Sequence, residues 1–384
     1  MKYAVVILDG AADLPMSELA GKTVLEAAKT PQLDALAQAG QVGLTLNTPK
    51  GMEASSNIAC TSICGYDPAE YPIGRGALEG AALDIELKPG EVALRTNLCI
   101  VEEGVMKSYS ADNITTEAAT PLYQALQTAL DDETFELREG TGFRGILIVR
   151  GHSELLQCRF EPAHNMTDER IADYPATGPA AAVALIEDYQ ARAQVVLAGL
   201  DTPVSDLLAF WPGERPAGMP AFAELYGKSA AMLSGVDLLA GIAGLAGIDV
   251  IKAPGVTDGP DNDYRVQAVA ALDALGGHDL VFVHVEAPDA EGHDGNLKGK
   301  LAAVEAIDAE IVRRLAALPE IRVMALPDHP TPVATKRHAA GPVPFMISGP
   351  GLPANSGRRL TEAEGAATGL CFDPGYKLLG SFLA

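Results

Sequence analysis

The chain has 384 residues, of which 48% are hydrophobic and 21% charged, a composition typical of a globular protein with a sizeable core. Its net charge of -23 argues against nucleic acid or an anionic membrane as the main partner, because both bind a basic face. No segment approaches the ~20 apolar residues of a membrane span, and the first apolar run is too short for a signal peptide. The odd number of cysteines, five, argues against a disulfide framework, so we expect a cytoplasmic protein.

The first part of the chain predicts a strand, a helix and a second strand. Residues 2–8 form a continuous apolar run, typical of a strand buried in a parallel sheet, and the run ends at Asp9. Residues 30–40 predict a helix, with proline at its first position and glycine after its end. A second strand is predicted at 42–47. A polar turn at 53–57 then leads into a short apolar stretch.

The middle of the chain has a different pattern of predicted elements, without regular alternation of strands and helices. A hairpin is predicted around Glu103 and Gly104. The other segments read, in order, as a helix at 115–132, strands within 135–151, an alanine-rich helix at 179–195 and a Pro/Gly-rich connector at 210–222. These patterns predict an inserted α+β domain at 88–225.

Strands and helices alternate again after residue 228. Strands are predicted at 229–233, 249–253, 280–285, 321–326 and 342–348, and helices at 236–247, 263–275 and 301–318. Such alternation is typical of α/β proteins with a doubly wound, mostly parallel sheet. We therefore predict a catalytic core made of residues 1–87 and 226–384, interrupted by the smaller domain.

Three carboxylates lie just past three of the predicted strands. In open α/β sheets, functional sites lie outside the carboxyl ends of the strands, so residues distant in sequence can meet there. Three histidines lie beside these carboxylates or in the same C-terminal region. The six residues are Asp9, Asp289, His293, Asp328, His329 and His338. Any one aspartate at a strand end is more often a turn former, so the prediction depends on the conjunction.

This mixed oxygen and nitrogen set suits divalent ions. Mn²⁺ and Zn²⁺ match it best, with Mg²⁺ and Co²⁺ as alternatives. Six ligands exceed what one catalytic centre with an open position needs, so two ions are predicted. His284 lies inside a predicted strand, and we interpret it as structural.

Ser55 and Ser56 offer a nucleophile at the turn before a predicted helix. A serine hydroxyl is a weak nucleophile at neutral pH, but a metal ion can activate it, and helix N-terminal amides can stabilise a phosphoryl group. Alternatively, one serine serves only as the N-cap of that helix. Local sequence does not choose between the two residues.

Five segments carry a family resemblance. They are ILDG, SSNIACTSICGYDP, IGRGALEG, VFVHVEAPDAEGHDG and the pair PDHPTP and KRHAAGPVPF. Together they resemble the 2,3-bisphosphoglycerate-independent phosphoglycerate mutases, in particular the archaeal-type branch, which belongs to the alkaline phosphatase superfamily. The resemblance extends over essentially the whole chain. The sequence departs from it at Asn57 and Asn165, where relatives tend to carry aspartate.

The resemblance implies roles for individual residues. One metal site would use Asp289, His293 and His338, and the other Asp9, Asp328, His329 and the nucleophile Ser56, with Ser55 as the fallback. Lys228 matches a lysine near the nucleophile. Arg75, Arg144 and His164 match positions near the substrate.

The implied activity is interconversion of 3-phosphoglycerate and 2-phosphoglycerate through a phosphoserine, without 2,3-bisphosphoglycerate as cofactor. The insert would act as a lid that excludes water. One alternative is a phosphohydrolase or phosphotransferase for another small phosphate ester, including a homoserine kinase, although no nucleotide-binding glycine-rich loop is evident. Another is a non-catalytic, metal-dependent binding protein. Whether the chain forms a homo-oligomer is left open by the sequence.

Overall fold

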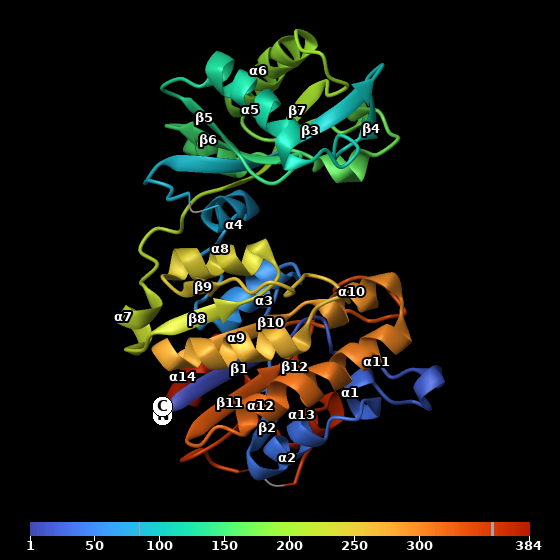
Figure 1. The fold of residues 1–384 in the computed structure, drawn as a ribbon, viewed down its shortest axis with the longest axis vertical. Coiled ribbons are helices and arrows are strands. Elements are labelled where there is room, and N and C mark those ends of the chain that lie inside the picture. The colour runs from blue at the N-terminus through green and yellow to red at the C-terminus, as the bar shows by residue number, and fades with distance from the viewer. Residues whose placement is uncertain (84, 355–356) are drawn as a thin grey trace. The chain divides into compact units, whose positions relative to one another are not determined.

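The computed structural model describes residues 1–83, 85–354 and 357–384, and the chain divides into two units (Figure 1). Unit 1 comprises Met1–Pro72 and Gly218–Ala384, and unit 2 comprises Ile73–Ala217. These boundaries differ from the expected insert at 88–225. The helix after Gly74 belongs to unit 2, because it packs on the sheet of that unit, and the short helix after Ala221 belongs to unit 1.

Unit 1 is built on an eight-stranded sheet in the order β13-β2-β12-β11-β1-β10-β8-β9. The strands are β1 (Lys2–Leu8), β2 (Gln41–Thr45), β8 (Ala230–Leu233), β9 (Asp249–Ile251), β10 (Leu280–Val285), β11 (Ile321–Leu326), β12 (Val343–Ser348) and β13 (Cys371–Phe372). All neighbouring pairs are parallel except those of β12 with β11 and β2. The predicted α/β class with a mostly parallel sheet is therefore confirmed.

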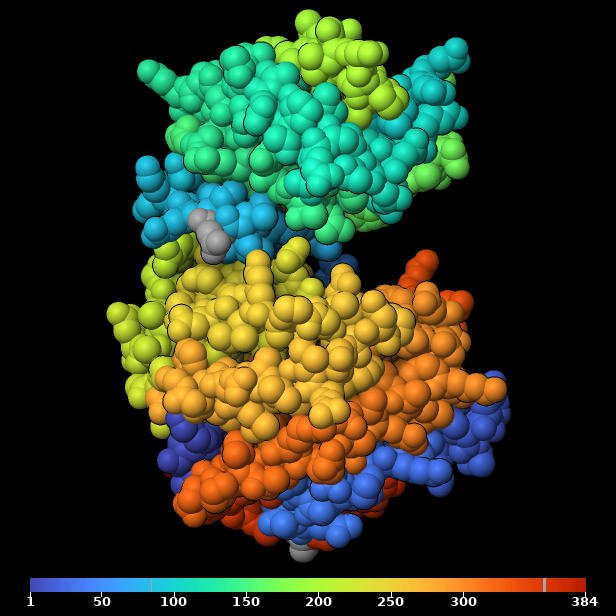
Figure 2. Space-filling view, in the orientation of Figure 1, coloured from blue at the N-terminus to red at the C-terminus, as the bar shows by residue number. Residues whose placement is uncertain are grey.

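Helices cover both faces of this sheet, which explains why its central strands are continuously apolar. The helices are α1 (Val24–Ala27), α2 (Pro31–Ala39), α3 (Ser56–Ile63), α7 (Phe222–Tyr226), α8 (Asp237–Ala246), α9 (Tyr264–Gly277), α10 (Ala287–Asp294), α11 (Leu297–Ala306), α12 (Arg313–Ala316), α13 (Glu362–Ala367) and α14 (Lys377–Leu383). Val6 of β1 shares a core with α9 and α11, whereas Tyr3 packs edge-on against Phe382 of α14. In the space-filling view, the yellow-to-orange part of the chain makes up most of the visible surface of unit 1 (Figure 2).

Unit 2 has an antiparallel sheet packed against helices. Its strands are β3 (Glu91–Glu102), β4 (Val105–Ser108), β5 (Phe135–Glu139), β6 (Arg144–Arg150) and β7 (Asp206–Gly213), in the order β4-β3-β6-β5 with β7 beside β3. Its helices are α4 (Arg75–Ala82), α5 (Thr116–Leu130) and α6 (Ala180–Ala198). The β3–β4 hairpin turns at Glu103 and Gly104, both at positive φ, as the sequence predicted.

Within the described residues, no helix combines the length and apolar character needed to cross a membrane.

Candidate metal centre

Three adjacent parallel strands of unit 1 lead to the predicted carboxylate ligands. β1 lies between β10 and β11 in the sheet. Asp9 follows β1 directly, Asp289 lies in the first turn of α10 after β10, and Asp328 lies two residues beyond β11. All three residues are buried, with at most 4% of their surface exposed. Since the carboxyl ends of parallel strands meet at one edge, the sheet gathers these residues there.

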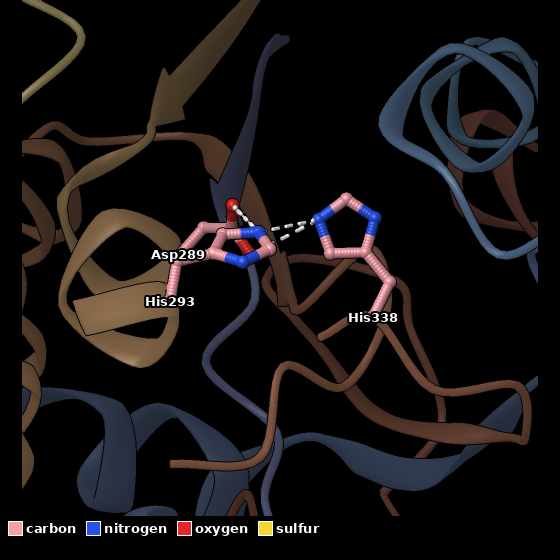
Figure 3. A group of neighbouring side chains, drawn as sticks. All are labelled: Asp289, His293 and His338. Atoms are coloured by element: carbon pink, nitrogen blue, oxygen red, sulfur yellow. Dashed lines mark hydrogen bonds and ion pairs between the residues drawn. The ribbon is translucent and has the colours of Figure 1, made fainter. Parts of the chain in front are cut away.

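Two histidines face each other beside Asp289 (Figure 3). Asp289 and His293 lie one turn apart on α10, and His338 comes from the loop before β12. His293 Nε2 lies 3.2 Å from Asp289 Oδ2, and His338 Nε2 lies 3.6 Å from Asp289 Oδ1. The ligand atoms of these three side chains lie within 4.8 Å of one another.

His329 joins the carboxylates that follow β1 and β11. Its Nε2 lies 3.1 Å from Asp328 Oδ2 and 3.8 Å from Asp9 Oδ1. Asp9, Asp289 and His329 form a second group whose ligand atoms lie within 4.8 Å. The six predicted aspartates and histidines thus lie in one continuous cluster.

The structure distinguishes between the two candidate serines. Ser56 is the first residue of α3, and its Oγ lies 3.2 Å from His329 Nε2. Ser55 is the N-cap residue of that helix, but its hydroxyl donates to the Glu53 carbonyl at 3.4 Å. The hydroxyl of Ser56 therefore lies against the cluster, whereas that of Ser55 bonds within its own loop.

The hydrogen bonds of the histidine rings show that the cluster fits a cation. His293 Nδ1 donates to the Lys336 carbonyl at 3.0 Å, and His338 Nδ1 donates to the Ala54 carbonyl at 3.1 Å. In neutral rings both Nε2 atoms then carry a lone pair, and these atoms lie 2.9 Å apart. Two lone pairs at this distance repel, so the geometry requires a proton or a metal cation beside these two nitrogens. Asp9 Oδ1 is also buried and has no hydrogen-bond partner among the described residues.

The pKa values of the buried carboxylates also indicate that the cluster fits a cation. Burial, and then the charge of Asp328, raises the pKa of Asp9 well above its usual value. Burial, and then the charge of Asp289, raises the pKa of Glu286 to about 8. Burial also works against ionised Asp289, but hydrogen bonds, foremost that with His293, hold its pKa below the usual range. A divalent cation would relieve this repulsion, so the donor set fits one.

Lys228 does not belong to this cluster, which corrects the prediction that it lies near the nucleophile. Its Nζ lies 4.8 Å from the ring centre of Tyr3, at the start of β1. Lys228 also precedes β8, which is parallel to β10 and, through it, to β1. It therefore lies at the amino edge of the sheet. The six residues from Tyr3 to Asp9 put it roughly 20 Å from the carboxyl edge.

The three predicted substrate contacts all lie in unit 2. The Arg75 guanidinium lies 3.9 Å from the ring centre of Trp211, and the His164 ring lies 5.5 Å from the same ring. Burial, and then the charge of Arg75, lowers the pKa of His164, so the imidazole is neutral near pH 7. Arg144 lies 5.2 Å from the Phe143 ring, which packs edge-on against Tyr109, and Tyr109 in turn packs against His164. Trp211 thus links Arg75 to His164.

Sequence reasoning missed three residues that support these groups. Thr331 Oγ1 donates a short hydrogen bond to Asp289, and His284 contacts Asp9 at 2.6 Å. Trp211 adopts φ 55°, which is rare for a bulky residue and common where a side chain is held for function. Two sequence signals were available. One is the polar residue at the end of an apolar strand, His284, and the other is the single tryptophan of the chain.

Known proteins resemble the chain over most of its length. The family model for 2,3-bisphosphoglycerate-independent phosphoglycerate mutase matches residues 37–201. The mutase of that name from Methanosarcina acetivorans is 40% identical over 361 residues, covering 90% of each chain. A probable mutase of that name from Geobacter sulfurreducens is 36% identical over 403 residues, covering all of both chains.

Solved structures share the fold. The PH0037 protein from Pyrococcus horikoshii superposes with a TM-score of 0.82 at 26% identity, covering 100% of this chain and 96% of the other. The cofactor-independent phosphoglycerate mutase from Thermoplasma acidophilum gives 0.67 at 22% identity over all of both chains, which supports the fold alone. On the evidence of its relatives, the chain belongs to the 2,3-bisphosphoglycerate-independent phosphoglycerate mutase family.

Proposed function

We propose that the chain interconverts 3-phosphoglycerate and 2-phosphoglycerate through a phosphoserine on Ser56. The observation that carries this proposal is the position of Ser56 Oγ, 3.2 Å from His329 in a cluster of six aspartate and histidine side chains. The names of the relatives supply the substrate.

Two divalent ions, Mn²⁺ or Zn²⁺ before Mg²⁺ or Co²⁺, would occupy the cluster. Asp289, His293 and His338 would hold one of them. Asp9, Asp328, His329 and the hydroxyl of Ser56 would hold the other. When bound, such ions lower the pKa of a serine hydroxyl and neutralise phosphoryl oxygens.

The chain itself supplies position and orientation. Ser56 opens α3, so the partial positive charge of the helix N-terminus favours a phosphoryl group on its oxygen. The hydroxyl of a retained glycerate then takes the phosphoryl group back from Ser56. Water must be excluded during this exchange, since hydrolysis of the phosphoserine would make the chain a phosphatase.

Unit 2 is proposed to bind the glycerate and to act as the lid. The Arg75 guanidinium lies over the Trp211 ring with half of its side chain exposed, and its Nε donates to Glu79 at 3.3 Å, which leaves its terminal N–H groups to bind a substrate carboxylate. Arg144 and His164 are proposed as further contacts. Trp211 is the only tryptophan of the chain, so addition of 3-phosphoglycerate should change the intrinsic fluorescence, and Arg75→Met should abolish that change.

The activity is tested by comparing Ser56→Ala with Ser55→Ala in an enolase-coupled assay with Mn²⁺ present. Ser56→Ala should lose at least about 10³-fold in rate, because it removes the proposed nucleophile. Ser55→Ala should retain most of the rate. Loss in Ser55→Ala alone would overturn the choice of nucleophile. Steady phosphate release by the wild type without 2-phosphoglycerate would show a phosphohydrolase instead.

A further inference from the structure

His284 is a buried histidine at the end of an otherwise apolar strand. It belongs to β10, where its register partner in β1 is Ile7, and its side chain is fully buried. Burying an imidazole is costly unless both ring nitrogens are hydrogen-bonded. The sequence around it, LVFVHV, offers no such partner, so the reason for this histidine lies in its neighbours.

Both ring nitrogens of His284 have partners. Nε2 lies 2.6 Å from Asp9 Oδ2, and Nδ1 lies 2.9 Å from Ser234 Oγ, just beyond β8. The Ser234 oxygen already accepts the backbone N–H of Val236 at 3.0 Å. With a cation bound, Asp9 is ionised and has no proton to give, so Nε2 carries the proton and donates it to Asp9. Nδ1 of the neutral ring is then an acceptor and takes the proton of the Ser234 hydroxyl.

A second set of contacts fixes the backbone under His284. Gln267 Nε2 of α9 donates to the His284 carbonyl at 2.8 Å, and the Gln267 amide oxygen accepts from Asn262 Nδ2 at 2.9 Å. Both amide side chains are buried. The imidazole is therefore held through its ring and through its backbone.

We propose that Ser234 and His284 are positioning residues that turn Asp9 into a one-oxygen ligand for a divalent cation. The hydrogen bond from His284 occupies Asp9 Oδ2. Asp9 Oδ1 is left buried, without a partner among the described residues, and 3.8 Å from His329 Nε2. The two oxygens thus have separate tasks, one anchored to the protein and the other directed to the metal. Histidine–carboxylate contacts of this kind orient metal ligands and tune their affinity.

The same proton assignment excludes a third metal site. Asp9, His284 and Glu286 also have ligand atoms within 4.8 Å of one another. The Glu286 Oε2 atom lies 3.6 Å from His284 Nε2. However, a nitrogen that donates its proton to Asp9 has no lone pair for a metal. The inference rests on the proposed metal centre and is independent of the substrate, and it predicts two bound ions per chain.

The test measures Mn²⁺ binding to the metal-free protein by calorimetry. His284→Leu should weaken one of two Mn²⁺ sites about 10- to 100-fold and leave the other unchanged. His284→Gln keeps an N–H donor and should recover most of the loss, and Ser234→Ala should fall between the two. His278→Gln serves as a matched control, because His278 also bonds an aspartate but lies at the amino edge of the sheet.

A second measurement needs no variant. Histidine-selective ¹⁵N NMR of the Zn²⁺-loaded wild type should show the His284 ring with its proton on Nε2. A proton on Nδ1, or wild-type Mn²⁺ affinity at both sites of His284→Leu, would overturn the inference while leaving the mutase proposal intact. A wild type that binds no Mn²⁺ would overturn both.

Discussion

Replacing Lys300 with methionine should destabilise unit 1 strongly. Lys300 lies on α11 and is fully buried, with its Nζ 2.8 Å from Asp13 Oδ2 and 2.7 Å from the Thr331 carbonyl. Asp13 follows the β1 loop that carries Asp9, and Thr331 follows the β11 loop that carries His329. The ammonium group therefore ties together the two loops that hold Asp9 and His329, two of the proposed metal ligands.

The magnitude follows from burial. Lys300→Met keeps the length of the side chain but leaves the Asp13 carboxylate buried without its cation, and breaking a buried pair in this way costs roughly 3–5 kcal/mol. In a domain the size of unit 1, each kcal/mol lowers the Tm by about 2–4 °C. The double variant Lys300→Met/Asp13→Asn removes the orphaned charge and should recover more than half of the loss.

The assay is guanidinium denaturation of the metal-free protein, followed by circular dichroism and by tryptophan fluorescence. The unfolding of each unit is analysed as a separate transition, because the two units need not unfold together. Trp211 lies in unit 2 and is the only tryptophan, so its emission reports that unit and acts as an internal reference. A loss below about 1 kcal/mol in Lys300→Met, or a double variant no more stable than the single one, would refute the reasoning.

Two further predictions concern other contacts. Thr331→Val removes the hydroxyl that donates to Asp289 and should weaken Mn²⁺ binding at that site about 10- to 100-fold in calorimetry; unchanged affinity would contradict the role of this hydrogen bond. His278 bonds Asp249 at 2.8 Å. This hydrogen bond, followed by a smaller contribution from a backbone hydrogen bond, raises the pKa of the His278 imidazole. The contribution of this contact to folding stability is therefore fully present below the pKa of histidine in the unfolded chain, about 6.5. It is lost as the pH rises through the pKa of His278 in the folded protein. Urea midpoints of His278→Gln should lie below the wild type at pH 5.5 and approach it by pH 8, and a constant gap would argue for a contact independent of charge.

The positions of residues relative to strands explain which predictions held. Asp9, Asp289 and Asp328 follow strands, and parallel strands bring their carboxyl ends to one edge, so their meeting was predictable. Lys228 precedes a strand, and the same rule sends it to the opposite edge. The family resemblance outweighed that rule in the prediction, and the structure shows that the rule was right for Lys228.

Other features depend on geometry that sequence patterns do not contain. Ser55 and Ser56 differ by one position at a helix start, and only the folded turn decides which hydroxyl meets His329. His284 looked structural because strand position alone does not show what an imidazole contacts. Residues 75–82, which form helix α4, were assigned to the core by the predicted boundary at 87. However, Ala77 of this helix packs with Ala93 and Ile146, and this small apolar cluster moves the boundary of unit 2 to residue 73.

The charge of the cluster determines the order in which its ligands can act. The chain carries a net charge of -23, and the edge that holds Ser56 adds buried carboxylates. Burial, and then the charge of neighbouring carboxylates, raises the pKa of Asp9 and of Glu286. A phosphate ester approaching this edge would meet like charge at short range, where low dielectric makes repulsion large. We therefore expect cations to bind before the substrate does. The buried carboxylates are unfavourable without a cation and favour the binding of divalent cations. The proposed orientation of Asp9 by His284 therefore matters as much as the number of carboxylates.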